Sequence, residues 1–419
     1  MHIKSLKLEN FRGASNLNLS LHPKLNVFYG VNGSGKSTVL DASAILLSWL
    51  VNRLKTERAS GRQIHEHDIQ NDAPNADIKM VFETENSQLH GWNLVKGRRY
   101  RSANGHRSKL TEITNFTNNM RQAIAAQAGE INIPLFAYYP INRTVLDIPL
   151  RIRKKHSFDL QAAFDGSLTS GANFRTFFEW YREREDIENE MIRHIGNDQL
   201  DEQLEAVRKA ITTLLPEFSN ITVRRNPLRM EIEKRGKKLI INQLSDGEKC
   251  LMAMVGDLAR RLAIANPVID DPLKGTGVIL IDEIDLHLHP KWQQMIVPKL
   301  LEVFPNCQFL MSTHSPSILA NVKPESLFML QDTSRGVKCS HPSESYGKSV
   351  DRILEDIMGL ETARPSHIDE KLRLLFRNIN HGRLSEARAT LKELSTKIGS
   401  DPELAKADVL IRRKEAIGK

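Results

Sequence analysis

A glycine-rich segment near the N-terminus has the residue types and spacing of a phosphate-binding loop. Residues 30–37 read Gly-Val-Asn-Gly-Ser-Gly-Lys-Ser and match G-x-x-x-x-G-K-S between a predicted strand and a predicted helix. Glycines let backbone N–H groups turn toward a phosphate, and the helix start adds its positive dipole. Lys36 would reach the outer phosphates, and Ser37 would hold Mg²⁺. The predicted nucleotide-binding residues of this segment are Gly30, Val31, Asn32, Gly33, Ser34, Gly35, Lys36, Ser37 and Thr38.

Two adjacent acids follow a predicted buried strand later in the chain. Residues 278–281 are Val-Ile-Leu-Ile, and Asp282 and Glu283 come directly after them. A strand buried on both faces would deliver these carboxylates to the edge of its sheet. Asp282 would help to hold Mg²⁺, and Glu283 would polarise the attacking water as a general base. In isolation such a pair is more often two solvated acids, and the phosphate-binding loop is what favours the catalytic interpretation.

Two further segments could contact phosphates. Residues 244–248 read Leu-Ser-Asp-Gly-Glu and open a long predicted helix, so the Ser245 hydroxyl and the Gly247 backbone would face a phosphate. An ordinary helix cap, with Glu248 in the first turn, is the alternative. His314 follows another apolar strand, and we expect it to contact the γ-phosphate.

Hydrophobic periodicity predicts the elements that must position these residues. Apolar residues alternate in the first 30 residues, which predicts three short strands, and the spacing becomes helical after Gly35. The apolar runs 278–281 and 309–311 are typical of parallel strands buried on both faces. Alternation from Ile78 to near Gly105 predicts an antiparallel meander. The predicted fold class is therefore α/β.

The chain divides into four predicted segments. Residues 1–150 carry the phosphate-binding loop and the meander, and residues 151–220 form a charged helical insertion. Residues 221–335 carry the rest of the sheet, and residues 336–419 form a basic helical tail. The amphipathic helices of the tail could bury against the head, dock a partner or extend an oligomer, and core packing is the default interpretation.

Composition excludes several classes of protein. The 419 residues are 40% hydrophobic and 26% charged, as in globular proteins with two or three structural units. The apolar run 44–51 is too short to span a bilayer, and Met1 opens directly into a strand pattern without a secretion signal. The three cysteines lack the spacing of a metal site. We therefore expect a cytoplasmic protein without a membrane partner.

The net charge of +8 permits an acidic partner. Basic residues gather in the tail, in the acid-free run 96–109 and in residues 151–155. Such clusters suit double-stranded DNA, but solvated helix and hairpin faces have the same composition. Both interpretations of these clusters stay open.

In their order along the chain, these motifs resemble those of ABC-type ATPases, and in particular the SMC/RecF/OLD-like branch. Asn10-Phe11-Arg12 matches that branch, and Asp246 stands where transporters have glycine. The resemblance implies an ABC-type ATPase head with an antiparallel β-subdomain, ATP and Mg²⁺ as ligands, and contact of Arg12 with nucleotide phosphates. It also implies at least a head-to-head dimer, because the signature segment of one copy acts in trans on the nucleotide of another. The signature residues are Leu244, Ser245, Asp246, Gly247 and Glu248.

A narrower resemblance points to the PtuA family of Septu-type antiphage systems, which is also found with some retrons. It rests on residues 138–143, on the form of the signature and on the tail. It implies that a separate HNH endonuclease, PtuB, is the partner. The Q-loop departs from the usual pattern, because Asn142 and Arg143 stand where a glutamine is expected.

The leading hypothesis is an ATPase that binds ATP and Mg²⁺ between paired heads and controls a bound nuclease through nucleotide occupancy. Two other functions stay open. A RecF-like DNA repair ATPase would grip duplex DNA with its basic patches and would show salt-sensitive, DNA-stimulated turnover. A nucleotide-sensing scaffold would bind ATP and scarcely hydrolyse it.

Overall fold

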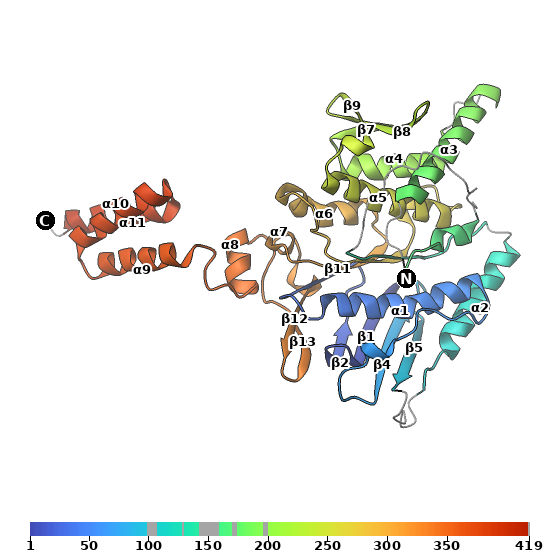
Figure 1. Cartoon of the computed structure of the whole chain (residues 1–419), viewed down its shortest axis with the longest axis horizontal. Helices are drawn as coiled ribbons and strands as arrows, with labels where there is room; N and C mark the ends of the chain where they lie inside the picture. The colour runs from blue at the N-terminus through green and yellow to red at the C-terminus, as the bar shows by residue number, and fades with distance from the viewer. Residues whose placement is uncertain (99–106, 128–129, 142–158, 170–173, 196–199, 418–419) are drawn as a thin grey trace. The chain divides into compact units, whose positions relative to one another are not determined.

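The computed structural model describes residues 1–98, 107–127, 130–141, 159–169, 174–195 and 200–417. They form two compact units, Met1–Gly347 and Lys348–Lys419. The first unit contains the sheets and the predicted nucleotide-binding motifs, and the second unit is helical (Figure 1). This boundary lies beyond the predicted start of the tail at residue 336, because residues 336–340 form a strand of the first unit.

The centre of the first unit is a six-stranded sheet with the order β13-β12-β3-β11-β10-β6. Its strands are β3 (Leu25–Tyr29), β6 (Leu135–Tyr139), β10 (Gly277–Ile281), β11 (Cys307–Ser312), β12 (Leu327–Thr333) and β13 (Gly336–Ser340). Every residue of β3, β6, β10 and β11 is buried, which explains why their sequences are largely apolar. The pairs within β12-β3-β11-β10-β6 are parallel, and β13 pairs antiparallel with β12 at one edge.

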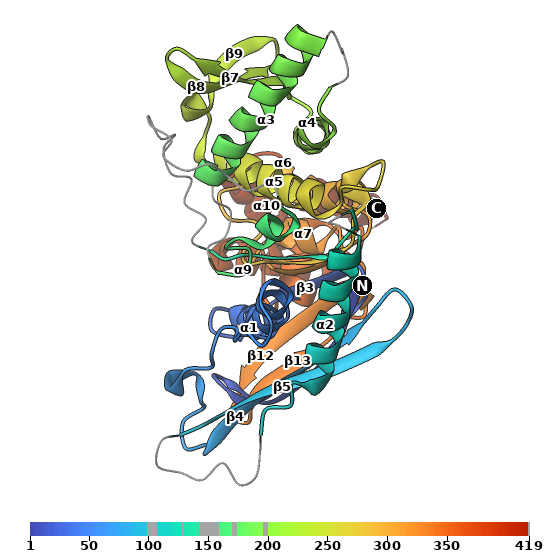
Figure 2. The same ribbon diagram turned by 90° about the vertical axis from the view of Figure 1, so that its right-hand side faces the viewer.

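Helices cover both faces of this sheet. Helix α1 (Lys36–Lys55) packs on one face, and α5 (Asp246–Ala265) and α6 (Pro290–Val303) lie on the other (Figure 2). Since β3, β10 and β11 are parallel, their carboxyl ends meet at one edge. The phosphate-binding loop, Asp282 and His314 each follow one of these strands, so the topology brings them to the same edge.

An antiparallel sheet with the order β2-β1-β4-β5 forms the β-subdomain. Its strands are β1 (His2–Phe11), β2 (Ala14–Ser20), β4 (Asn75–Glu83) and β5 (Leu89–Gly97). Helix α2 (Thr111–Ala126), which sequence analysis does not predict, packs against β5 and α1. The described part of the predicted meander ends with β5, and Gly105 lies outside the described residues.

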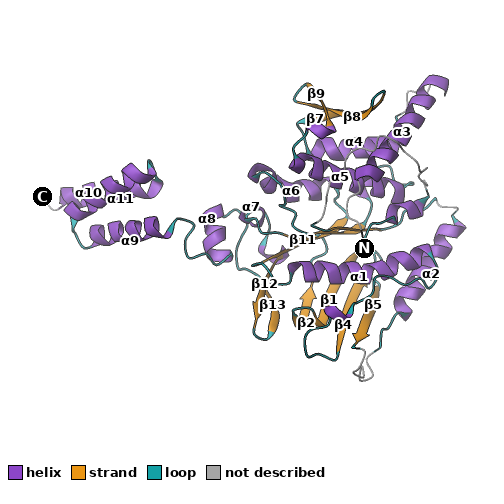
Figure 3. Cartoon of the chain, viewed as in Figure 1, coloured by secondary structure: helices purple, strands orange, loops and turns teal. Residues whose placement is uncertain are grey.

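The predicted helical insertion contains two described helices, α3 (Phe174–Ile195) and α4 (Glu202–Leu214). A three-stranded antiparallel sheet follows them (Figure 3). Its strands are β7 (Phe218–Arg225), β8 (Leu228–Lys234) and β9 (Lys237–Ile240). Helix α4 packs against α5, so the insertion rests on the helix that opens with the signature segment.

The second unit contains α8 (Val350–Arg352), α9 (Ser366–Asn380), α10 (Leu384–Ile398) and α11 (Pro402–Ile417). The last three helices bury their apolar residues against one another in a core of Ile368, Leu372, Leu375, Ile379, Ala387, Leu394, Leu404, Ala407 and Ile411. The amphipathic faces of these three helices therefore form the core of the second unit. Among the residues that the structure describes, no helix combines the length and the apolar character needed to cross a bilayer.

A buried ionic network joins α5 to the central sheet. Asp257 is fully buried and accepts hydrogen bonds from Arg260 at 2.8 Å, from Arg261 at 2.7 Å and from the Tyr139 hydroxyl at 3.1 Å. Burial would raise the pKa of Asp257, but the guanidinium groups of Arg261 and Arg260 outweigh it and lower this pKa. The carboxylate therefore balances two cations that water does not reach.

Replacing this carboxylate tests how far the head depends on the network. Asp257→Ala should lower the free energy of unfolding by about 3–5 kcal/mol, because it leaves uncompensated buried charges. The measurement is the urea midpoint of the unfolding transition. Glu57→Ala, at an exposed position, serves as the control and should stay within about 0.5 kcal/mol of the parent. A loss below about 1 kcal/mol for Asp257→Ala would contradict the expectation.

Candidate nucleotide-binding site

The phosphate-binding loop connects β3 to α1 through a left-handed backbone. Gly30, Gly33 and Gly35 have φ values of 147°, 80° and 97°. At Gly30 a Cβ atom would lie 2.2 Å from the carbonyl oxygen of Leu330 and 2.8 Å from Oγ of Ser34. Space as well as conformation therefore requires glycine there. Leu330 lies on β12, so this strand forms one wall of the loop.

Lys36 folds back over the loop. Its Nζ donates hydrogen bonds to the carbonyl oxygens of Gly30 and Val31, both at 3.0 Å. Burial lowers the pKa of Lys36, and the nearby carboxylates of Glu283 and Asp282 oppose this shift. A partly desolvated ammonium that is held by neutral carbonyl groups can exchange them for phosphate oxygens, which are stronger acceptors.

Oxygen atoms beside Lys36 fit a nucleotide with its metal ion. Ser34 is fully buried, and its Oγ has no hydrogen-bond partner within the described part of the chain. A ligand that reaches the loop would satisfy this atom. The Ser37 hydroxyl and the Asp282 carboxylate are hard oxygen donors, the type that Mg²⁺ prefers. Half-buried Thr38 follows in the first turn of α1, and Asn32 is exposed in the loop.

Ser312 ties the ends of β10 and β11 together. Its hydroxyl donates to the carboxylate of Asp282 and accepts a hydrogen bond from the backbone N–H of Glu283 at 2.7 Å. The backbone N–H of Asp282 in turn donates to the carbonyl oxygen of Tyr139 at 2.9 Å. Glu283 has a φ of 47°, in the left-handed region, so the chain turns sharply after Asp282. The two adjacent acids therefore occupy different settings, with Asp282 buried at the sheet edge.

Asp285 holds the segment that contains His314. Its Oδ1 accepts hydrogen bonds from the Thr313 hydroxyl at 2.6 Å and from the backbone N–H of His314 at 3.3 Å. Gln293, in the first turn of α6, accepts a hydrogen bond from the Ser315 hydroxyl at 2.7 Å. The loop after Glu283 and the segment around His314 are thus bonded to each other.

The signature segment forms the N-terminus of α5. Ser245 is the N-cap residue, and its Oγ accepts a hydrogen bond from the backbone N–H of Glu248 at 3.4 Å. A Cβ atom at Gly247 would lie 2.2 Å from the carbonyl oxygen of His287, so glycine allows the helix to approach the loop that follows Glu283. Asp246 has a side chain that is 85% exposed and pairs with Lys249 at 2.9 Å. Leu244 is buried just before the cap.

Arg12 lies in a cluster of charges beside α1. Its Nη1 is 2.9 Å from Oδ2 of Asp41, and its Nε is 2.9 Å from Oδ1 of Asp68. Arg62 also reaches Asp41, at 3.4 Å. Two acids thus engage the Arg12 side chain, and contact of Arg12 with a nucleotide stays a prediction.

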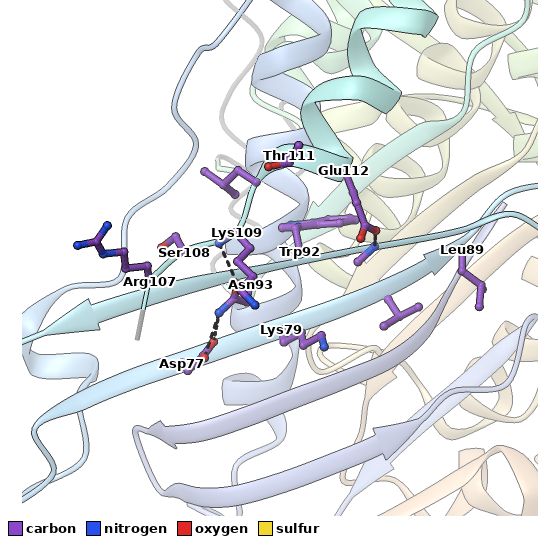
Figure 4. A pocket seen from close by; sticks show the side chains of 13 residues that line it. Asp77, Lys79, Leu89, Trp92, Asn93, Arg107, Ser108, Lys109, Thr111 and Glu112 are labelled. Carbon is purple, nitrogen blue, oxygen red and sulfur yellow. Dashed lines mark hydrogen bonds between the residues drawn. The ribbon is translucent and has the colours of Figure 1, made fainter. Parts of the chain in front are cut away.

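A cavity of about 1090 Å³ lies over β4 and β5, where residues 107–112 run beside β5 (Figure 4). Lys79, Arg107 and Lys109 line it. Asn93 lies among them and accepts a hydrogen bond from the backbone N–H of Lys109 at 2.9 Å. Two members of the basic run 96–109 therefore reach this cavity, which lies on the β-subdomain.

Other predicted features are structural or fall outside the described residues. Arg98, in the basic run, donates from Nε to the carbonyl oxygen of Ala73 at 3.0 Å and so helps to hold the loop before β4. The Q-loop candidates Asn142 and Arg143 lie outside the described residues, as does the basic cluster 151–155.

Sequence analysis missed the hairpin of β12 and β13. Besides Leu330, this hairpin contributes Val337, whose Cγ2 would lie 3.2 Å from a Cβ atom at Gly35. The run Leu-Phe-Met-Leu at residues 327–330 is a signal that could have revealed β12. No local sequence pattern marks Gln293 or Lys234 as part of the site, because each residue contacts the site only through tertiary packing.

Comparisons with known proteins identify the family of this chain. The family model for the RecF/RecN/SMC N-terminal domain matches residues 2–338. The "Retron Vc95 probable ATPase" of Vibrio cholerae is 30% identical, over 90% of this chain and 82% of its own length. The "Retron Ec83 probable ATPase" of Escherichia coli is 28% identical, over 96% and 85%. The "Septu protein PtuA" of Bacillus thuringiensis is 24% identical, over 88% and 87%.

The fold and the motifs together define an ABC-type ATPase head with a helical tail. The chain belongs to the RecF/RecN/SMC N-terminal domain family, and retron and Septu ATPases are among its relatives. The predicted fold class and the predicted family are thereby confirmed.

Removing the Lys36 ammonium tests the position of the nucleotide site. Lys36→Ala should weaken ATP binding by at least about 100-fold, because charge-assisted hydrogen bonds to phosphate are lost. Isothermal titration with ATP and Mg²⁺ measures this affinity. Lys323→Ala, at an exposed lysine outside the loop, should bind as the parent does. Equal affinity of Lys36→Ala and the parent would refute the site assignment.

Proposed function

We propose that this chain is the ATPase subunit of an antiphage defence complex, in which ATP and Mg²⁺ bound between paired heads control a separate HNH nuclease. The observation that carries the proposal is the similarity to retron and Septu ATPases over nearly the whole chain. Those matches span more of the chain than the family model, which ends at residue 338. They therefore favour a defence function over a RecF-like repair function.

In this proposal the residues at the carboxyl edge of the sheet bind and orient the nucleotide. Lys36 exchanges its carbonyl partners for phosphate oxygens, and the loop N–H groups point toward the same phosphates. Ser37 and Asp282 would hold Mg²⁺, which supplies charge neutralisation on the phosphates when bound. Glu283 takes the proton of the attacking water, and His314 contacts the γ-phosphate.

The arrangement of the helices supports pairing of two heads. The phosphate-binding loop opens α1 and the signature opens α5, and these helices cover opposite faces of the sheet (Figure 2). The carboxylates of Glu283, Asp282 and Asp285 lie near Lys36. Asp246 of the signature pairs instead with Lys249. The resemblance to ABC-type ATPases implies that Ser245 and Gly247 act on nucleotide that a second copy holds. The resemblance to PtuA supports PtuB as the nuclease partner, and the basic clusters leave double-stranded DNA as a further partner.

Removing the proposed general base should separate binding from hydrolysis. Glu283→Gln should bind ATP within about threefold of the parent and lower turnover by about 100-fold or more. ATP should then hold the variant in a paired state, which mass photometry detects. Glu325→Gln, at an exposed position, is the matched control. Equal turnover of Glu283→Gln and the parent would instead indicate a nucleotide-sensing scaffold.

Purification of the tagged chain from its own operon, with ATP and Mg²⁺ present, tests the proposed partner. We expect mass spectrometry to find a small HNH-type nuclease in fixed ratio with this chain. Recovery with replication or repair factors, together with salt-sensitive turnover stimulated by DNA, would favour the RecF-like function.

A further inference from the structure

The first turn of α5 carries a carboxylate where the proposed function places a phosphate. Glu248 is only 6% exposed. Its Oε2 accepts hydrogen bonds from the backbone N–H of Ser245 at 2.9 Å and from the Ser245 hydroxyl at 3.0 Å. The same hydroxyl would meet the nucleotide of a second copy. Because carboxylate and phosphate are both anions, Glu248 would repel that nucleotide unless its charge were compensated.

The compensating charge comes from a different part of the fold. Lys234, the last residue of β8, donates from Nζ to Oε1 of Glu248. The two oxygens of the carboxylate are thus divided between Lys234 and Ser245. Burial would raise the pKa of Glu248, but Lys234 and Ser245 outweigh it and lower this pKa. The carboxylate is therefore ionised at neutral pH and needs its cation.

The surroundings of this ion pair fit an anion that arrives from outside. A cavity of about 310 Å³ is lined by Ser245, Glu248, Lys234, His287 and Lys291, and by Glu217, whose carboxylate pairs with Arg235. The ammonium of Lys234 also lies 5.5 Å from the centre of the Phe218 ring of β7. An aromatic ring at this distance helps to keep the ammonium in place.

We propose that Lys234 is a positioning residue for ATP-dependent pairing of the heads. By neutralising Glu248, it allows the Ser245 hydroxyl to turn its proton from the Glu248 carboxylate to the γ-phosphate of nucleotide held by a second copy. The inference rests on the proposed function, because it requires nucleotide between two heads. It also assigns a task to the three-stranded sheet, since β8 delivers Lys234 to the signature segment.

Variants of the ion pair in the full chain test this assignment. Analytical ultracentrifugation gives the concentration of a slowly hydrolysed ATP analogue that produces half-maximal pairing. Lys234→Met should raise this concentration by about tenfold, because it leaves a carboxylate next to the phosphate site. Lys234→Arg keeps the positive charge and should stay within about twofold of the parent. Lys238→Met, at an exposed lysine of β9, is the control and should pair as the parent does.

A second substitution at Glu248 separates compensation from direct phosphate binding. Glutamine at this position can still cap Ser245 but carries no charge. Lys234→Met combined with Glu248→Gln should therefore restore pairing to within about twofold of the parent. Glu248→Gln alone should reach half-maximal pairing at an analogue concentration no higher than that of the parent. This comparison keeps the test decisive if Lys234→Met fails to fold.

Four results would overturn the assignment. Pairing of Lys234→Met at the parental concentration would show that the lysine is not needed. A double variant as weak as Lys234→Met would show that the lysine acts otherwise than through Glu248, as would weaker pairing of Glu248→Gln alone. A parent chain that binds the analogue without pairing would overturn the proposed function and this inference together, whereas the other three results leave the proposed function standing.

Discussion

The hydroxyl of Ser312 is the contact on which the geometry of the site depends. It bridges two neighbouring parallel strands at their carboxyl ends, donating to Asp282 and accepting from the backbone N–H of Glu283. Parallel strands end at the same edge, but their register alone does not orient the side chains beyond that edge. Ser312 supplies this orientation, because one hydroxyl fixes the carboxylate of the first acid and the backbone of the second. The left-handed turn at Glu283 is thereby held in place.

A site that binds a polyphosphate must also offset the negative charge of its own carboxylates. Asp282 and Glu283 lie near Lys36, whose pKa is lowered by burial. Glu248 lies beside Ser245 and is held by Lys234. In both places a lysine lies next to the carboxylate that would otherwise repel the ligand. The same pattern at the phosphate-binding loop and at the signature indicates that charge balance constrains both halves of the site.

The sequence predicts the parts of this fold that depend on local pattern. Continuous apolar runs identify β10 and β11, and the change from alternating to helical spacing after Gly35 identifies α1. The motif residues are predicted for the same reason, because phosphate-binding loops and helix caps are local. Strand β13 escapes prediction, since Gly336–Ser340 is short and only Val337 is fully buried. The contact of Lys234 with Glu248 escapes as well, because it joins a sheet to a helix through tertiary packing.

The loop from Glu283 to His289 links the acids near Lys36 to the signature segment of the same chain, which in the proposed function contacts the nucleotide of a second copy. Glu283 and His287 have φ values of 47° and 62°, conformations that cost non-glycine residues about 1–3 kcal/mol each. Hydrogen bonds to Ser312 and from Thr313 to Asp285 hold one end of the loop. At the other end, the carbonyl oxygen of His287 packs against Gly247 of the signature. The loop is thus fastened at both ends, between the acids that face Lys36 and the start of the signature helix.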